Sequence, residues 1–296
     1  MKFLPVYPLA LSAALVAASP AAVNNSASGA AASAINFGIT HIINAASVFD
    51  INGVTFLIDP FFSPQNTSFP VPGLSKAIWS LLEPALTPEQ IPPIDAVLLS
   101  HEDHPDNLDP IARMRFLDGR KVLTTPAGTD ALQPRPGVQA MENWKTVSLE
   151  LNGQVWNFTG TPCQHMPGGQ VTGFIITGPG FGSTDGRPNA IWYSGDTLYL
   201  PELARMREQF HIKVAVLNMG AAYLISDVGE PYRIIMNGTE VARTFQDVGA
   251  EILVPLHYDS FSHFPEGKDD ARRDFESSGV ADHVRWVTSG QRTTIL

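Results

Sequence analysis

The sequence is poor in cysteine. A single cysteine, Cys163, occurs among 296 residues. One thiol cannot form an internal disulfide, and it excludes zinc sites built on two or more thiolates. Any metal must therefore be held mainly by histidine and carboxylate side chains. The Gly-x-Ser-x-Gly motif is also missing, which argues against an α/β-hydrolase serine mechanism.

Basic residues are few as well. The chain has 19 Lys and Arg against 29 Asp and Glu, which gives a formal net charge of −10. Because no basic stripe is present to release counterions from a phosphate backbone, nucleic acid is excluded as a partner. A small-molecule substrate is the partner that we expect.

Long apolar runs are missing after the N-terminus, so no later segment is expected to span a membrane. Residues 1–22 contain Lys2 and a Pro-interrupted apolar run that ends in small residues, which is typical of a secretory signal peptide. An N-terminal membrane anchor is the alternative. Residues 23–34 are mostly Ala, Ser, Asn and Gly and predict a disordered leader. Four Asn-x-Ser/Thr sequons are compatible with a secreted glycoprotein. They begin at Asn24, Asn66, Asn157 and Asn237.

The remaining residues, 35–296, predict one domain of the α/β class. Early strands are expected at 39–43, 47–51 and 54–58, with a hairpin turn at Asn52-Gly53. The apolar run 94–100 is typical of a strand buried on both faces. Later strands are expected at 121–124, 145–151, 154–159, 173–176, 190–194, 214–217 and 252–256, and helices at 110–117 and 238–248. This order indicates two sheets, each covered by helices.

Residues 61–93 contain several prolines and predict a long excursion from the sheet, with one helical piece at 75–82. Long ordered excursions commonly cover a site. We expect this segment, which carries Phe69 and Trp79, to form a lid or a dimer contact.

Histidines follow several of the predicted strands, in segments that also hold acids and turn-forming residues. These histidines are His101, His104, His165 and His257. Gly195 allows the backbone to turn sharply at the end of another predicted strand. Asp196 therefore follows that strand, as the histidines follow theirs. Neutral imidazole and carboxylate are the ligands available without thiols, and two adjacent divalent ions need about this many. The pattern predicts a metal centre.

The order of these segments resembles the metallo-β-lactamase-fold hydrolases from Ile39 to Leu296. Within that superfamily it looks most like the branch of ascorbate-phosphate lactonases and N-acyl phosphatidylethanolamine phospholipases. The segments that carry this likeness are Leu57-Ile58-Asp59-Pro60 and Pro255-Leu256-His257-Tyr258. The resemblance implies an αββα sandwich with a metal centre at the sheet edges.

The first metal motif departs from the family pattern His-x-His-x-Asp-His and leaves two registers open. In one, His101 and His104 are ligands on a loop that is one residue longer. In the other, Glu102 replaces the first histidine and Asn107 replaces the last. We favour the first register, because imidazole is the better ligand and matches His165 as a third nitrogen donor.

By this resemblance, one ion is held by His101, His104 and His165, and a second by Asp106, Asp196 and His257. Asn107 stands where a further histidine is expected and is a candidate extra ligand, so the second ion should bind more weakly or be absent. Zinc is the expected metal, with one or two ions, and the added oxygen donors leave Mn or Fe open.

The implied mechanism is attack on a carbonyl or phosphoryl centre by a water activated at the metal, with Asp106 orienting the water and moving its proton. Tyr258 either donates a hydrogen bond to the developing oxyanion or packs in the wall. His263 is a candidate substrate contact at the pocket mouth. We expect a secreted hydrolase of an ester or lactone. The alternatives are a metal-dependent phosphodiesterase and a non-catalytic binding protein on a degenerate hydrolase scaffold.

Overall fold

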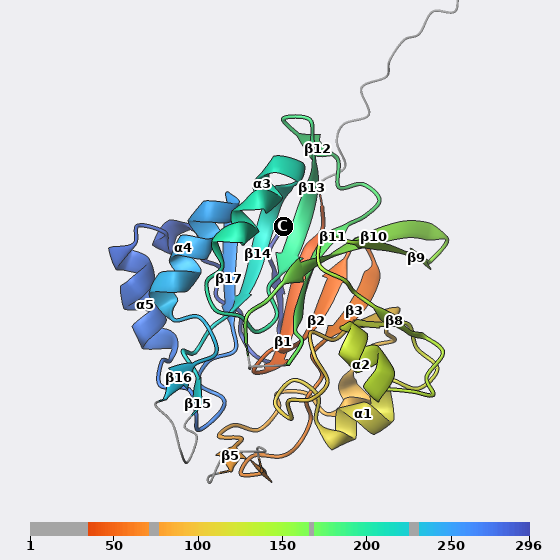
Figure 1. Cartoon of the computed structure of the whole chain (residues 1–296), viewed down its shortest axis with the longest axis vertical. Coiled ribbons are helices and arrows are strands. Elements are labelled where there is room, and N and C mark those ends of the chain that lie inside the picture. The colour runs from red at the N-terminus through yellow and green to blue at the C-terminus, as the bar shows by residue number, and fades with distance from the viewer. Residues whose placement is uncertain (1–34, 71–76, 166–168, 225–230) are drawn as a thin grey trace, which may run out of the picture. The chain divides into compact units, whose positions relative to one another are not determined.

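A first sheet has the strand order β18-β1-β2-β3-β6-β7-β8 (Figure 1). Its strands are β1 (Phe37–Ile43), β2 (Ala46–Ile51), β3 (Val54–Ile58), β6 (Ala96–Leu98), β7 (Val122–Thr124), β8 (Val138–Ala140) and β18 (Arg292–Thr294). The hairpin between β2 and β3 turns at Asn52 and Gly53, which both have the positive φ that such a turn requires. From β3 to β8 the neighbouring strands are parallel.

A second sheet has the order β17-β14-β13-β11-β10-β9, with β12 paired to β13. Its strands are β9 (Thr146–Leu151), β10 (Gln154–Pro162), β11 (Thr172–Thr177), β12 (Ser183–Thr184), β13 (Arg187–Tyr193), β14 (His211–Asn218) and β17 (Ile252–Leu256). Strands β13, β14 and β17 are parallel. Two short pairs lie apart from the sheets: β4 (Ser68–Phe69) with β5 (Ile78–Trp79), and β15 (Tyr223–Leu224) with β16 (Tyr232–Arg233).

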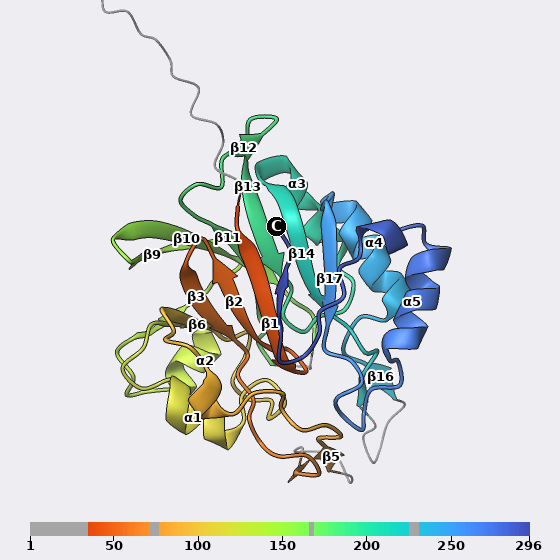
Figure 2. The same ribbon diagram turned by 180° about the vertical axis from the view of Figure 1, so that it is seen from behind.

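Helices cover the outer face of each sheet, as Figure 2 shows from behind. The first sheet carries α1 (Pro110–Phe116) and α2 (Pro126–Ala131), and the second carries α3 (Met206–Gln209), α4 (Gly238–Val248) and α5 (Lys268–Ser277). Short 3-10 helices span Pro88–Gln90, Pro201–Arg205 and Ala281–His283. Helix α4 begins where the Asn237 side chain accepts from the Glu240 N–H, and it ends at Gly249 in the left-handed region.

The apolar core lies in three layers because successive strand residues face opposite sides of a sheet. On β3, Phe56 and Ile58 pack into the layer between the sheets, whereas Leu57 packs toward the first pair of helices. On β13, Tyr193 faces the shared layer and Trp192 faces the helices of the second sheet. The expected αββα arrangement is confirmed.

The structure is a computed structural model and describes residues 35–70, 77–165, 169–224 and 231–296. The predicted signal peptide and leader lie outside these residues. Within them, no helix combines the length and the apolar character that crossing a membrane requires.

The helix predicted at 75–82 is wrong where the structure describes it. Ile78–Trp79 is strand β5, and residues 71–76 lie outside the described residues. The extended form is fixed by distant partners, because the Trp79 N–H donates to Ser262 Oγ at 3.0 Å and Ser80 bridges to Phe261. Such contacts override a local helical pattern.

Candidate metal centre

The candidate ligands come from loops that follow four different strands. His101 lies three residues after β6, Asp196 three residues after β13, and His257 directly after β17. His165 lies three residues after β10. All four are nearly or fully buried, with His165 the most exposed at 9 %. The fold therefore gathers side chains that are far apart in the sequence.

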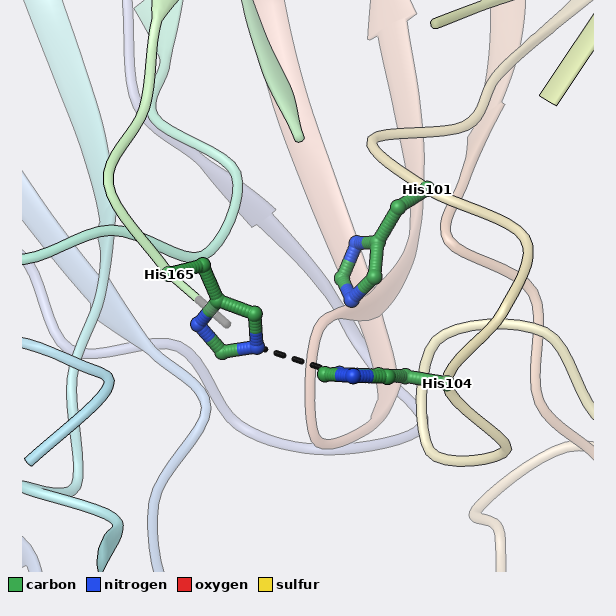
Figure 3. Close-up of side chains that lie close together, drawn as sticks. All are labelled: His101, His104 and His165. Atoms are coloured by element: carbon green, nitrogen blue, oxygen red, sulfur yellow. Dashed lines mark hydrogen bonds between the residues drawn. The ribbon is translucent and has the colours of Figure 1, made fainter. Parts of the chain in front are cut away.

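His101, His104 and His165 form the first group (Figure 3). Their ligand atoms lie within 4.8 Å of one another, and Nε2 of His165 is 3.0 Å from Nδ1 of His104. Glu102, the alternative to His101, is not in this group, and its backbone carbonyl accepts a hydrogen bond from Arg113. The geometry corresponds to the first of the two registers.

Asp106, Asp196 and His257 form the second group. His257 Nε2 lies 3.4 Å from Asp106 Oδ2 and 3.3 Å from Asp196 Oδ2. Two ligands placed about 2.0–2.2 Å from one tetrahedral zinc ion are separated by about 3.3–3.6 Å, so these distances fit. Asp196 Oδ2 is also 3.9 Å from His101 Nε2. Asp196 therefore lies between the two groups, as a shared ligand would.

Hydrogen bonds on Nδ1 orient three of the histidines. His165 and His257 donate from Nδ1 to the backbone carbonyls of Ile234 (2.7 Å) and Met219 (3.2 Å). His101 donates to Ser100 Oγ at 2.8 Å. Each of these rings turns Nε2 toward the other ligands, and Nε2 of His165 lies 3.0 Å from Nδ1 of His104. The Nε2 atoms of His101 and His257 are buried without any hydrogen-bond partner. Buried polar atoms are rarely left unpaired, so these atoms fit a role as metal ligands.

Asp59 lies behind the ligands and collects several donors. Its carboxylate accepts from the Ser100 N–H and hydroxyl, both at 2.6 Å, and from the Tyr193 hydroxyl at 2.6 Å. Because the Ser100 proton is donated to Asp59, Ser100 Oγ is left to accept from His101. Burial raises the pKa of Asp59 to about 6, against the lowering effect of these hydrogen bonds. The resemblance marked the Asp59 segment, but its partners are visible only in the structure.

The charge distribution of the centre favours a cation. Burial lowers the pKa of His165 to about 4 and that of His101 well below its ordinary value, so both rings are neutral. Burial also acts to lower the pKa of His257, but Asp196 and Asp106 outweigh it and raise the value to about 10. A proton on His257 thus lies between two carboxylates. A metal ion bound there would displace that proton.

His257 has a backbone conformation that few non-glycine residues adopt, with φ of 67°. Its N–H donates to the Asn44 carbonyl at 3.1 Å, which helps to hold this conformation. Asn44 also donates from Nδ2 to the backbone carbonyl of Asp106 at 3.0 Å and to its Oδ2 at 3.4 Å. Sequence reasoning missed Asn44, and only its place in a turn before β2 hinted at a special conformation.

The two remaining candidates, Asn107 and His263, lie beside different carboxylates. Asn107 is fully buried, and its Nδ2 donates to Asp59 Oδ2 at 3.2 Å while its Oδ1 has no partner. His263 Nε2 lies 3.9 Å from Asp106 Oδ2, and burial lowers its pKa to about 4.

Two residues near the ligands have packing roles. The Tyr258 ring packs edge-on against Trp286 at 5.9 Å, beside the apolar layer under α4 and α5. This position favours the wall-packing alternative for Tyr258. The Cys163 thiol is 3.3 Å from the Ser194 carbonyl, and burial raises its pKa, so it remains protonated.

Comparison with known proteins gives consistent matches. A family model described as a beta-lactamase superfamily domain matches residues 55–258. The UPF0173 metal-dependent hydrolase MK1542 of Methanopyrus kandleri is 25% identical over 267 residues, which cover 86% of this chain and 97% of the relative.

Solved structures share the fold. A possible metal-dependent hydrolase from Veillonella parvula has a TM-score of 0.70 at 22% identity and covers 88% of this chain and 99% of its own. An isothiocyanate hydrolase from Delia radicum gut bacteria has a TM-score of 0.69 at 20% identity, covering 86% and 98%. Both agree with the αββα architecture described above.

Proposed function

We propose that this chain, which belongs to the beta-lactamase superfamily and is a metal-dependent hydrolase with the metallo-β-lactamase fold, cleaves a carboxylic ester or a lactone. The observation that carries the proposal is the pair of adjacent ligand groups, in which buried Nε2 atoms lack any other partner. The resemblance is confirmed at the level of the superfamily. The narrower branch of ascorbate-phosphate lactonases and N-acyl phosphatidylethanolamine phospholipases stays a prediction.

Zinc is the metal that we propose. Three nitrogen donors in the first group suit zinc, and the two carboxylates of the second group also suit Mn or Fe. When bound, such ions polarise a carbonyl or phosphoryl oxygen and lower the pKa of an attacking water. A degenerate site that binds no metal is disfavoured by the fit of both groups.

Asp106 is the residue that we propose to orient the attacking water and to accept its proton. Burial alone would raise its pKa, but the interactions with the nearby imidazoles of His257 and His263 outweigh burial and lower it. Asp106 is therefore ionised at neutral pH, as an acceptor must be. Asn44 holds its backbone and one carboxylate oxygen in place.

A substrate without a phosphate group is supported by the contacts of two arginines. Arg233 and Arg243 lie on either side of Met236 in the sequence and are the arginines that we consider as a phosphate clamp. Arg233 pairs with Glu240, and Arg243 stacks over the Tyr199 ring at 4.1 Å. Cations engaged in this way are poorly placed to bind a phosphate oxygen as a bidentate pair. An ester or lactone carbonyl needs no such clamp.

Secretion belongs to the proposal as well, on the strength of residues 1–22. Among the sequons that the structure describes, Asn66 is exposed. The Asn237 side chain instead caps α4, so a glycan on it would compete with the cap. We therefore propose Asn66 as the better glycosylation site.

The test pairs elemental analysis with a substrate panel of lactones, aryl esters, isothiocyanates and phosphodiesters. His165→Ala and Asp196→Ala should lose metal and turnover together, whereas His211→Ala, which changes a histidine paired with Glu251 away from the centre, should keep both. Activity that survives both ligand substitutions would reject the proposal. Turnover of phosphodiesters alone would favour the phosphodiesterase, and no metal retained under saturating zinc or manganese would favour the binding protein.

A further inference from the structure

The two ligand groups differ in their nitrogen donors. The first has three imidazoles, but the second has His257 alone beside two carboxylates. Asn107 occupies the position at which the sequence led us to expect another imidazole. Its amide nitrogen is turned to Asp59, at 3.2 Å. The first metal motif therefore supplies no nitrogen ligand to the second group.

Another imidazole lies beside the second group. His263 comes six residues after His257, and its Nε2 is 3.9 Å from Oδ2 of Asp106. Two ligands of one ion at about 2.0–2.2 Å are at most about 4.4 Å apart, so the separation from Asp106 is within range. His263 is not part of the set formed by Asp106, Asp196 and His257, whose ligand atoms all lie within 4.8 Å of one another, so its ring must move toward the ion to bind it. The other ring nitrogen, Nδ1, is buried without a partner, and the side chain as a whole is 17% exposed.

The His263 ring has little hydrogen bonding of its own. Among the described residues it makes no hydrogen bond, and it packs on Phe264 with ring centroids 4.4 Å apart and on Phe261 at 5.8 Å. Nδ1 is the buried nitrogen that lacks a partner. Nε2 lies on the side of Asp106 and makes no hydrogen bond with a described residue, so it is free to bind a ligand.

The segment that carries His263 is anchored on both sides. Ser262 donates from its N–H to the Trp79 carbonyl at 3.0 Å and accepts from the Trp79 N–H on its hydroxyl. Ser260 donates to Asn44 Oδ1 at 2.9 Å, and Asn44 in turn contacts Asp106. These bonds tie the backbone before His263 to the same residue that positions Asp106.

We propose that His263 is a ligand of the second metal ion and supplies through Nε2 the nitrogen donor that position 107 does not. This inference rests on the metal centre of the proposed function. It replaces the substrate contact expected for His263 from sequence. The two roles differ in a measurable way, because a substrate contact would change KM and leave metal binding unaltered.

The experiment titrates metal-free protein with Co²⁺ and counts the bound ions by elemental analysis and by cobalt absorption. Wild type should bind two ions. His263→Ala should keep the first and bind the second at least ~10–100-fold more weakly, since losing only an outer partner of a ligand already costs that much. His211→Ala is the matched control and should bind both ions as wild type does.

Proton NMR of the cobalt-loaded protein gives a second readout that does not depend on activity. The Nδ1 proton of a bound His263 should appear as a paramagnetically shifted exchangeable signal and should be missing in His263→Ala. Thermal unfolding of the metal-free variant verifies that it still folds.

The outcomes separate the two proposals. If wild type binds two ions, and His263→Ala binds both with unchanged affinity and signals, the role of His263 is overturned while the hydrolase centre stands. Wild type that binds a single ion also overturns it. Wild type that binds none overturns the proposed function itself.

Discussion

The hydroxyl of Tyr193 donates a 2.6 Å hydrogen bond to Oδ2 of Asp59. Tyr193 ends β13 in one sheet, and Asp59 follows β3 in the other, so this bond joins the two sheets just behind the metal centre. Asn218 extends this series of hydrogen bonds, because its Nδ2 donates to the Tyr193 oxygen at 2.9 Å and to Asp196 Oδ1 at 2.7 Å. The sheets and the ligand Asp196 are therefore positioned by one buried network.

Tyr193→Phe should lower the free energy of unfolding by about 1.5–3 kcal/mol, because a buried hydrogen bond to a carboxylate is lost. Urea denaturation measures the change. Tyr258→Phe is the control, since the Tyr258 hydroxyl makes no hydrogen bond with the residues that the structure describes and its loss should cost little. Equal effects of the two substitutions would contradict a special role for the Tyr193 bond.

Gly195→Ala should destabilise the fold and reduce metal content. Gly195 has φ of 60°, and an added Cβ would lie 2.8 Å from the Thr172 carbonyl oxygen and 3.0 Å from Ser100 Cβ. Gly186 is the control, since its φ of 76° is similar but no atom lies within 4 Å of an added Cβ. Gly186→Ala should cost about 1–2 kcal/mol for the left-handed backbone alone. Thermal melts and elemental analysis should show a larger loss for Gly195→Ala.

Asn44→Gly should weaken metal binding ~10–100-fold, the usual cost of removing an outer partner of a ligand. Glycine tolerates the φ of 55° at this position, so the change removes the hydrogen bonds to Asp106 with little backbone strain. Asn52→Gly is the matched control, because Asn52 has φ of 50° in the β2–β3 hairpin and binds Pro179 instead. Calorimetric zinc titration compares them, and equal affinities would refute a positioning role for Asn44.

His41 should make stability depend on pH. Burial lowers its pKa below the ordinary 6.5, so at mildly acidic pH the unfolded chain binds a proton that the folded chain does not. Stability should therefore fall as pH decreases through 6.5 toward the folded-state pKa. His41→Gln removes this pH-dependent contribution, so the free energy of unfolding of the variant should decline less between pH 8 and pH 5 than that of the wild type. Parallel pH profiles in the two proteins would show that His41 makes no such contribution.

Much of the fold was predictable where the pattern is local. The turn at Asn52-Gly53 and the buried strand before His101 follow from backbone preference and from apolar runs. Helix α5 was missed, because among its ten residues only Ala271 and Phe275 are buried and its apolar stripe is narrow. Strand β18 was missed because Arg292–Thr294 is polar and becomes a strand only by pairing with β1.

The sequence by itself determined the chemistry of the centre, because a lone cysteine and histidines placed after strands limit the ligands to imidazole and carboxylate. Tertiary structure decided which of these side chains meet. It brought His101 rather than Glu102 to His165, and it placed Asn44 and His263 beside Asp106. The reason is physical: a side chain carries its donor atoms wherever it lies, but the distance between two donors depends on strands and loops that pack across the whole fold.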